Sequence, residues 1–265
     1  MIPTRKAATR LHVRIDVSSN NFLSKVIADD VSCMSVKAVR GLRTVIRRRW
    51  TTELANASNQ GRVAKGLLLD SSSDIARLTS ARTQLRFDEW KLIHRSRLSI
   101  LPLLGTPGIS APDSRGRSCK TGAETTSHVT SHCPVTLPEI KRSHDAILEE
   151  LANIIRKAGQ TVRVNLAFPG TMLRPDVVVT STTPQIIIDL TIPFDAPESL
   201  QPGFDRKLVK YGHLCPTLPL VIGALGSWLP SNNAVASSLN ILPNAWRRFR
   251  RRSRLCHPEH HESGL

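Results

Sequence analysis

Two aspartates in the C-terminal half of the chain have the type and spacing that phosphodiester hydrolysis needs. Asp176 follows a proline, and Asp189 lies inside an apolar, β-rich run, with twelve residues between the two carboxylates. A hairpin that turns near Thr182 would place them side by side at the end of a sheet. Neighbouring carboxylates repel each other unless a divalent cation neutralises them, and Mg²⁺ prefers carboxylate and water oxygens. We therefore expect Asp176 and Asp189 to bind Mg²⁺.

A lysine beside this pair would complete a nuclease site, because an ammonium group can orient the attacking water or stabilise the developing charge. Lys207 and Lys210 follow on the next expected helix, and Tyr211 lies four residues after Lys207 on the same helical face. A plainer interpretation of Asp176 is a turn residue after proline. That interpretation suits Asp189 less well, because an unpaired carboxylate inside an apolar strand is costly.

A second cluster has the residue types of a zinc site. Cys119, His128 and Cys133 are separated by eight and four residues. A structural zinc ion takes four nitrogen or sulfur ligands, and a Cys-x-x-Cys start would put the first of them at Gly116. His132 is the only nearby substitute, and the alternative is a small turn and helix without metal. The cluster predicts a knuckle in which Gly116 stands at the position of the expected cysteine.

The elements that would position these residues are indicated by hydrophobic periodicity. Apolar residues at helical spacing predict helices at 35–54, 72–100, 139–158 and 204–214. β-Branched and alternating runs predict strands at 161–168, 177–179, 186–192 and 220–225. The order of helix, three strands, helix and strand indicates an α/β domain with a mixed sheet, within a chain of the α+β class.

The chain is strongly basic, with a formal net charge of +16 and a pI near 10.6. This excess points to a polyanionic partner, most often nucleic acid, although a merely basic soluble protein has the same composition. Arginines on the helix at 35–54 and one beside Asp176 are the candidate phosphate contacts. They are Arg43, Arg47, Arg48, Arg49 and Arg174. A solvated amphipathic helix is the alternative for 35–54.

The C-terminal part contains a second arginine-rich stretch around Trp246 and Phe249. Its arginines are Arg247, Arg248, Arg250, Arg251, Arg252 and Arg254. This stretch could be a basic helix on nucleic acid, a nuclear-import-like patch or a charged, poorly ordered end. The three interpretations stay open on sequence alone.

The composition also excludes several classes of protein. No apolar run of about 18 residues is present, and the N-terminus lacks the apolar core of a signal peptide, so we expect no membrane span and no secretion. Five scattered cysteines indicate a reducing compartment rather than a disulfide framework. Nothing in the sequence implies a small-molecule substrate.

Segment by segment, the chain divides into five expected parts. They are a poorly defined start at 1–32, a basic helical linker region at 33–110, a degenerate zinc knuckle at 111–136, a nuclease domain at 137–230 and a basic, flexible tail at 231–265. The proline- and glycine-containing stretch at 101–116 supplies the boundary before the knuckle.

Several blocks stand in collinear order over residues 33–230. They are the segment from Asp29 through Trp50, Trp90 through Leu103, Cys119 to Pro134, His144-Asp145, Arg174-Pro175-Asp176, Ile188 to Phe194, Lys207 to Tyr211, and Val221 to Trp228. Together they resemble the restriction-like-endonuclease class of non-LTR retrotransposon polyproteins. Ser143 and Gly116 stand where that family usually has arginine and cysteine.

The resemblance implies a PD-(D/E)xK-like nuclease fold, in which a lysine normally lies two residues after the second acid. Thr191 occupies that position here, and in this retrotransposon class the lysine lies on the following helix, which implies Lys207, with Lys210 as the second choice. It also implies a nuclear, metal-dependent endonuclease that nicks target DNA for reverse transcription of element RNA. The alternative is an inactive nucleic-acid-binding segment of a degenerate element copy.

Overall fold

The computed structural model of the chain describes residues 14–17, 24–28, 31–33, 35–70 and 86–254. The chain divides into two compact units, Met1–Ala57 and Ser58–Leu265. Part of the helix expected at 72–100 lies outside the described residues, and the helix described there is α5 (Phe87–Arg97). The finer division expected at 33–110, 111–136 and 137–230 stays a prediction.

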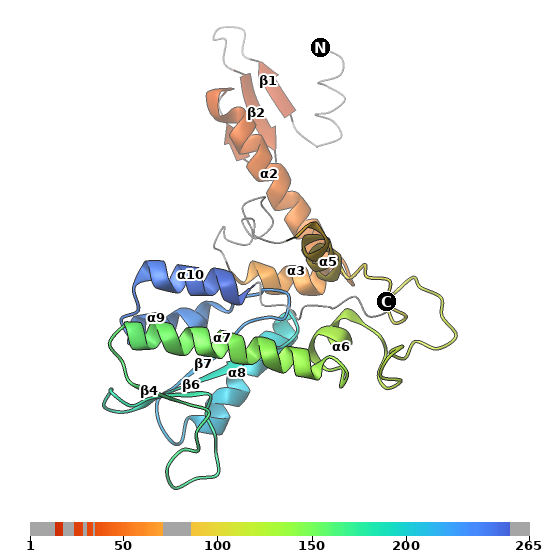
Figure 1. Cartoon of the computed structure of the whole chain (residues 1–265). Helices are drawn as coiled ribbons and strands as arrows, with labels where there is room; N and C mark the ends of the chain where they lie inside the picture. Colours follow the sequence, from red (N-terminus) through yellow and green to blue (C-terminus); the bar gives the residue numbers. More distant parts are fainter. Residues whose placement is uncertain (1–13, 18–23, 29–30, 34, 71–85, 255–265) are drawn as a thin grey trace. The chain divides into compact units, whose positions relative to one another are not determined.

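The first unit combines a small sheet with one long helix. Strands β1 (Arg14–Val17), β2 (Ser24–Ala28) and β3 (Val31–Cys33) are antiparallel neighbours in that order, and α2 (Ser35–Asn56) follows them (Figure 1). The sequence analysis predicted α2, because its valines, leucine and isoleucine recur at three- and four-residue spacing. It did not predict the strands, since three to five residues are too few to display a clear alternation.

The second unit contains the elements that carry the candidate site. Its helices are α3 (Gly61–Leu68), α5, α6 (Thr126–Ser131), α7 (Leu137–Lys157), α8 (Pro197–Tyr211), α9 (Asn233–Ser238) and α10 (Pro243–Ser253), with a 3-10 turn η1 at Pro230–Asn232. Its strands are β4 (Val162–Val164), β5 (Val177–Val179), β6 (Ile186–Thr191) and β7 (Thr217–Val221). From α7 to β7 this is the order of helix, three strands, helix and strand that the sequence predicted, and the α+β class is confirmed.

The four strands form one mixed sheet in the order β4-β5-β6-β7. The pairs β4–β5 and β5–β6 are antiparallel, whereas β6 and β7 are parallel and joined through α8. Val177 pairs with Ile188, so the residues just beyond, Asp176 and Asp189, face each other across the two strands. A parallel neighbour on one side and an antiparallel one on the other bury β6 in the middle of the sheet.

Helices cover both faces of the sheet. Alternate strand residues such as Val177, Ile188 and Leu220 pack against the apolar stripe of α7 in the main core. The residues between them, including Val178 and Ile187, pack against Tyr211 at the end of α8. Because side chains alternate along a strand, Asp189 points to the α8 side, as Ile187 does. The fold therefore aims the buried carboxylate at α8.

The C-terminal segment differs from the flexible tail expected at 231–265. Helices α9 and α10 lie within this segment (Figure 1). Trp246 and Phe249 of α10 belong to the main core and pack against Trp228. Six arginines dominate the composition of this stretch and suggest a solvated end. Two aromatic residues three positions apart lie on one face of a helix, and their burial fixes α10 to the core although most of its other residues are charged.

Two further differences have local causes. The sequence placed the start of α8 near 204, because Pro202 argues against a helical interior. In the structure α8 begins at Pro197, since proline is favoured in the first helical turn, and Pro202 lies inside the helix. α3 was not expected, and its close packing requires Gly66, where a Cβ would collide with the backbone of Asp195. Within the ranges that the structure describes, no helix is both long and apolar enough to span a membrane.

Candidate functional site

Asp176 and Asp189 meet at the ends of strands β5 and β6, as the sequence predicted. The backbone N–H of Asp176 donates to Asp189 Oδ1 at 3.1 Å. In return, the backbone N–H of Leu190 donates to Asp176 Oδ2 at 2.7 Å. Each carboxylate is thus held by the backbone of the opposite strand, which fixes the two side chains side by side.

Lys207 is the lysine that joins this pair. Its ammonium group forms an ion pair with Asp189 Oδ2, and the side chain of Asp189 is only 2% exposed, against 24% for Lys207. The cation therefore compensates the buried negative charge while it stays reachable from solvent. Lys210, one helical turn later, is exposed, with Nζ 4.7 Å from the centroid of the Tyr211 ring. The geometry separates the two lysines that the sequence left as alternatives.

Tyr211 is buried beneath the site and supports it. Its hydroxyl donates to the carbonyl oxygen of Arg174 at 3.1 Å, two residues before Asp176. Burial, and then the negative charge of Asp189, raises the pKa of Tyr211 well above its ordinary value. The phenol therefore stays protonated and acts as a donor that holds the segment before Asp176 in place.

His144 on α7 also reaches the site. Its Nε2 lies 3.5 Å from Asp176 Oδ2, and its Nδ1 lies 3.2 Å from Asp145 Oδ1. Burial lowers the pKa of His144, but the hydrogen bonds and charges of Asp176 and then Asp145 raise it above its ordinary value. The sequence analysis noted His144-Asp145 only as part of a resemblance. His144 and Asp176 are 32 residues apart in the sequence, so the packing of α7 on the sheet is what brings them together.

Asp195, in the loop after β6, is a buried carboxylate that was not identified from the sequence. Asp195 is fully buried and accepts hydrogen bonds from the backbone N–H groups of Leu225 and Ser227, the latter at 2.7 Å. Burial raises the pKa of Asp195, despite these bonds and the nearby Arg97. A Cβ at Gly223 would collide with Asp195 Oδ1. Asp195 thereby ties the loop after β7 to the strand that carries Asp189. An aspartate in the apolar run after β6 was the signal that could have revealed it.

The oxygen atoms of the pair suit a hard divalent cation. Asp189 Oδ1 and Asp176 Oδ2 accept backbone hydrogen bonds, and Asp189 Oδ2 faces Lys207. Among the described residues, Asp176 Oδ1 accepts no hydrogen bond. In each carboxylate, one oxygen thus accepts a backbone hydrogen bond and the other does not. Mg²⁺ commonly takes one or two carboxylates and completes its shell with water and phosphate oxygens, so this donor set fits it.

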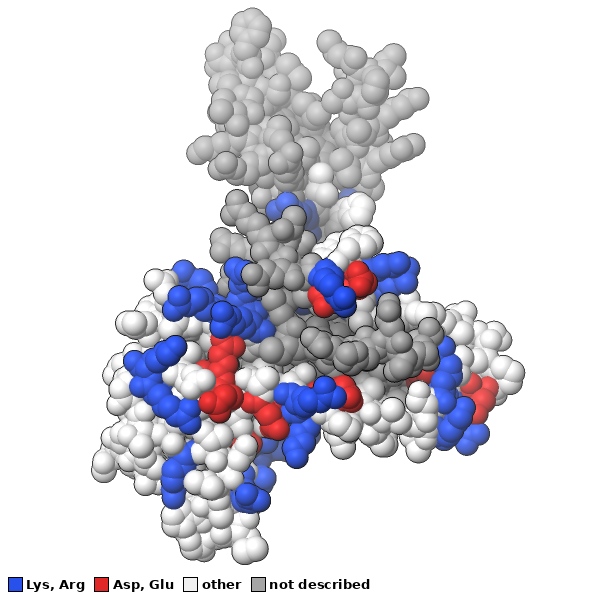
Figure 2. All heavy atoms as spheres, in the orientation of Figure 1, with Lys and Arg blue, Asp and Glu red and all other residues white. Residues whose placement is uncertain are grey.

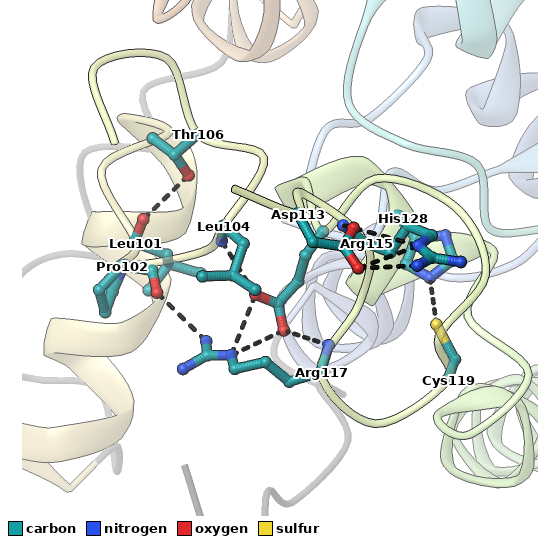
Figure 3. A network of polar contacts seen from close by, with 10 residues as sticks. Leu101, Pro102, Leu104, Thr106, Asp113, Arg115, Arg117, Cys119 and His128 are labelled. Carbon is teal, nitrogen blue, oxygen red and sulfur yellow. Dashed lines mark hydrogen bonds and ion pairs between the residues drawn. The ribbon is translucent and has the colours of Figure 1, made fainter. Parts of the chain in front are cut away.

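The knuckle residues also come together. The ligand atoms of Cys119, His128 and Cys133 all lie within 4.8 Å of one another, and Cys119 Sγ is 3.2 Å from His128 Nε2 (Figure 3). Hydrogen bonds from Thr121, and then from His128, lower the pKa of Cys119 to about 6. A thiolate is the form that binds metal, so this environment favours a metal ligand.

The fourth position of the knuckle is marked by Gly116. A Cβ there would lie 2.6 Å from Cys119 Sγ and 3.7 Å from His128 Nε2, so position 116 points at the cluster. His132, the substitute considered from the sequence, is exposed at the end of α6 and does not belong to the group. The geometry thus provides three ligands, with Gly116 at the expected position of a fourth.

A buried glutamate anchors the knuckle to the preceding segment. Glu124 accepts hydrogen bonds from the backbone N–H of Leu104 at 2.9 Å and from Arg117 Nε at 3.0 Å. Arg117 also donates to the carbonyl oxygen of Pro102 at 3.2 Å (Figure 3). Burial raises the pKa of Glu124, but the bonds from Arg117 and Leu104 outweigh it and leave the pKa below its ordinary value.

The arginines expected to contact phosphates belong to both units of the chain. Arg47 and Arg48 are exposed on α2, whereas Arg49 forms an ion pair with Glu53 at 2.9 Å. The side chain of Arg43 lies outside the described residues, although its backbone is part of α2. Arg174 is exposed beside Asp176 and donates to the carbonyl oxygen of Asn165 at 3.1 Å. Arg174 therefore lies next to the carboxylate pair in the second unit, whereas the other four arginines belong to the first unit.

Comparison with curated proteins gives matches to Pol polyproteins. One relative, the "Retrovirus-related Pol polyprotein from type-1 retrotransposable element R2" of Popillia japonica, is 30% identical over 160 residues, covering 52% of this chain and 33% of the relative. A second protein of the same name and organism is 30% identical over 167 residues, covering 54% and 24%. The chain thus spans about a third of the first relative's length. No profile of a known protein family matches the chain.

Proposed function

Since the chain is a retrotransposon-derived polyprotein sequence related to element R2, we propose that its carboxylate site is a metal-dependent DNA endonuclease. The single observation that carries the proposal is the meeting of Asp176, Asp189 and Lys207 at one strand end. Two acids and a lysine are the set that phosphodiester hydrolysis uses, and the mixed sheet with helices on both faces supports the resemblance to PD-(D/E)xK nucleases.

In this proposal Asp176 and Asp189 hold Mg²⁺. Held by these two residues, Mg²⁺ would supply a more acidic water and would neutralise charge on the phosphate oxygens. The backbone hydrogen bonds to both carboxylates fix their orientation before substrate arrives. Because little reorganisation is needed at the moment of reaction, this rigidity favours catalysis.

Lys207 supplies a partly exposed positive charge. Its side chain is partly exposed and pairs with Asp189, so its ammonium group can donate a hydrogen bond to a phosphate oxygen next to the acids. Tyr211 and His144 act as positioning residues through Arg174 and Asp176. The exposed Arg174 guanidinium can hold a neighbouring phosphate of the same strand.

In its polyprotein this site would nick target DNA so that reverse transcription of element RNA can begin at the nick. Target DNA and element RNA are then the partners, the nucleus is the place of action, and the basic charge of +16 supports binding to both. The exposed Arg47 and Arg48 on α2 would contribute phosphate contacts.

A second proposal concerns the knuckle. Cys119, His128 and Cys133 would bind Zn²⁺, supported by the approach of their ligand atoms within 4.8 Å. Three protein ligands leave a fourth place to water, which predicts weaker binding than that of a closed four-ligand structural site. The Glu124 bonds to Leu104 and Arg117 hold the loop together independently of the metal.

The nuclease proposal is tested by nicking of supercoiled plasmid with purified protein in Mg²⁺ or EDTA. Wild type should nick only with the metal, and Asp176→Asn and Asp189→Asn should each abolish the activity. Metal-independent nicking, or nicking that survives both substitutions, would exclude this site as its source.

A further inference from the structure

Helix α10 presents an arginine surface that the proposed nuclease site does not use. The helix is fixed to the molecule by Trp246 and Phe249, which are buried, stack on each other at 5.1 Å and pack edge-on against Trp228. Because two aromatic anchors hold the helix, its solvent face keeps a fixed orientation. The arginines on that face are therefore preorganised rather than carried on a loose end.

The six arginines of this stretch divide into two groups. Arg250 and Arg254 turn inward, where both form ion pairs with Asp70 and lie over the Trp228 ring at 5.2 and 5.5 Å. Arg252 forms an ion pair with Glu150 at 3.2 Å. These three have structural partners and need no further ligand.

The remaining three arginines face solvent without a carboxylate. Arg247, Arg248 and Arg251 are exposed, and α10 contains no acidic residue. Within the described part of the chain, none of the three has an ion pair, and Arg247 bonds only to the side-chain oxygen of Asn244 at 3.3 Å. Figure 2 shows Lys and Arg side chains gathered over the place that α10 occupies in Figure 1.

Positions 247, 248 and 251 lie on one helical face, because residues three and four apart are neighbours on a helix. Like charges at this spacing repel each other, by a few tenths of a kcal/mol per pair. A polyanion with regularly spaced charges removes that repulsion and releases its own counterions, which favours binding further.

We propose that the Arg247, Arg248 and Arg251 face of α10 binds the phosphate backbone of duplex DNA. A straight, anchored helix suits the regular phosphates of a duplex, and arginine pairs with phosphate through two parallel N–H bonds. This contact is sequence-independent and adds affinity for the DNA that the nuclease site acts on. The choice of DNA rests on the proposed function, whereas the binding face itself does not require catalysis.

The test is duplex DNA binding by the full chain in EDTA, measured by fluorescence anisotropy from 0.05 to 0.2 M salt. The variant combines Arg247→Gln, Arg248→Gln and Arg251→Gln. The matched control combines Arg115→Gln, Arg142→Gln and Arg156→Gln, which remove the same charge from exposed arginines paired with Asp113, Glu139 and Glu149. Circular dichroism and thermal unfolding verify that both variants fold.

If three phosphates are contacted, the negative slope of log affinity against log salt should be shallower by about 2.7 in the α10 variant than in wild type. Its affinity defect relative to wild type should then shrink about 40-fold between 0.05 and 0.2 M salt. The control should change the slope much less. Equal slopes for the two variants would overturn the inference. Absence of nicking by wild type, with this slope change intact, would refute the nuclease proposal alone.

Discussion

Lys207 and Asp189 form an ion pair between helix α8 and strand β6, in which the carboxylate is buried and the ammonium group is reachable from solvent. A buried carboxylate without a partner would be costly, so this pair accounts for how Asp189 is tolerated inside an apolar strand. The same arrangement leaves the cation beside the position where a phosphate would meet the acids. The stability of the fold and the proposed chemistry thus depend on the same contact.

The two lysines of α8 should differ sharply in a nicking assay. Lys207→Gln should slow nicking by about a hundredfold to a thousandfold, the range seen when one charge-stabilising donor is removed. Lys210→Gln is the matched control, because Lys210 is exposed, lies over the Tyr211 ring and forms no ion pair with any residue that the structure describes. Equal effects from both substitutions would contradict the assignment of Lys207. Thermal unfolding should accompany the assay, since Lys207→Gln also removes the partner of Asp189.

Completing the knuckle should strengthen zinc binding. Gly116→Cys should tighten Zn²⁺ affinity by at least about tenfold, because a third thiolate would supply the fourth ligand and close the tetrahedron. A Cβ at 116 would lie 2.6 Å from Cys119 Sγ, so that thiol must shift as the site closes. Competition with a chromophoric chelator measures the affinity, and Gly116→Ser supplies the same bulk without a thiol. If serine and cysteine at 116 gave the same affinity, position 116 would not be a ligand position.

Glu124 should make the stability of the second unit depend on acid pH. The pKa of Glu124 in the folded state lies below its value in the unfolded chain, which is about 4.3. The stabilisation of the fold by Glu124 is therefore complete above the unfolded pKa and is lost as the pH falls through the folded pKa. Glu124→Gln should lower the free energy of unfolding at pH 7 by about 1.5–3 kcal/mol, as for hydrogen bonds to a charged group.

Urea unfolding of the metal-free protein between pH 3 and 7 checks this prediction. The curve for Glu124→Gln should be flatter than that of wild type below the unfolded pKa. The control is Glu149→Gln, which removes an exposed glutamate paired with Arg156 and should change stability little. An unchanged pH profile for Glu124→Gln would show that the Arg117 and Leu104 bonds do not stabilise the charged form.

Two glycines near the site should respond in opposite directions to alanine. Gly223→Ala should destabilise the protein by about 1–3 kcal/mol, because the new Cβ would collide with the buried Asp195 carboxylate. Gly203→Ala, inside α8, meets its nearest neighbours at 3.5 and 3.6 Å and should stabilise by about 0.5–1 kcal/mol through helix propensity. Urea unfolding measures both. Equal changes in the free energy of unfolding from the two substitutions would contradict the role of Asp195 in holding the loop after β7.

Much of the second unit could be predicted because its elements have clear patterns. The β-branched run at 177–179 and the apolar run at 186–192 mark strands, and the apolar stripe that includes Leu148 and Leu151 marks α7. Asp189 was identified because a carboxylate is rare inside such a run. The pairing of Val177 with Ile188 then follows from a hairpin, and it brings Asp176 opposite Asp189.

The features that were missed depend on tertiary contacts. His144 precedes Asp176 by 32 residues, and no local pattern indicates that α7 packs beside the start of β5. Lys207 and Lys210 are both plausible from spacing alone, and only the placement of α8 over β6 distinguishes them. α10 was taken for a charged end because its arginines conceal two buried aromatic residues.

The central claim is that the Asp176–Asp189 pair, with its metal, makes the DNA nick. The most direct measurement is the rate at which the 265-residue chain nicks supercoiled plasmid in Mg²⁺ and in EDTA, for wild type and Asp189→Asn. The matched control is Asp205→Asn on α8, whose exposed side chain accepts a hydrogen bond from Gln201 at 3.0 Å. Duplex binding in EDTA shows that each variant still engages DNA.

With Mg²⁺, wild type and Asp205→Asn should nick the plasmid at equal rates. Neither protein should nick it in EDTA. Asp189→Asn should bind the duplex and nick it at least about a hundredfold more slowly. Equal nicking by wild type and Asp189→Asn, or a folded wild type that binds DNA in Mg²⁺ and never nicks it, would contradict the account.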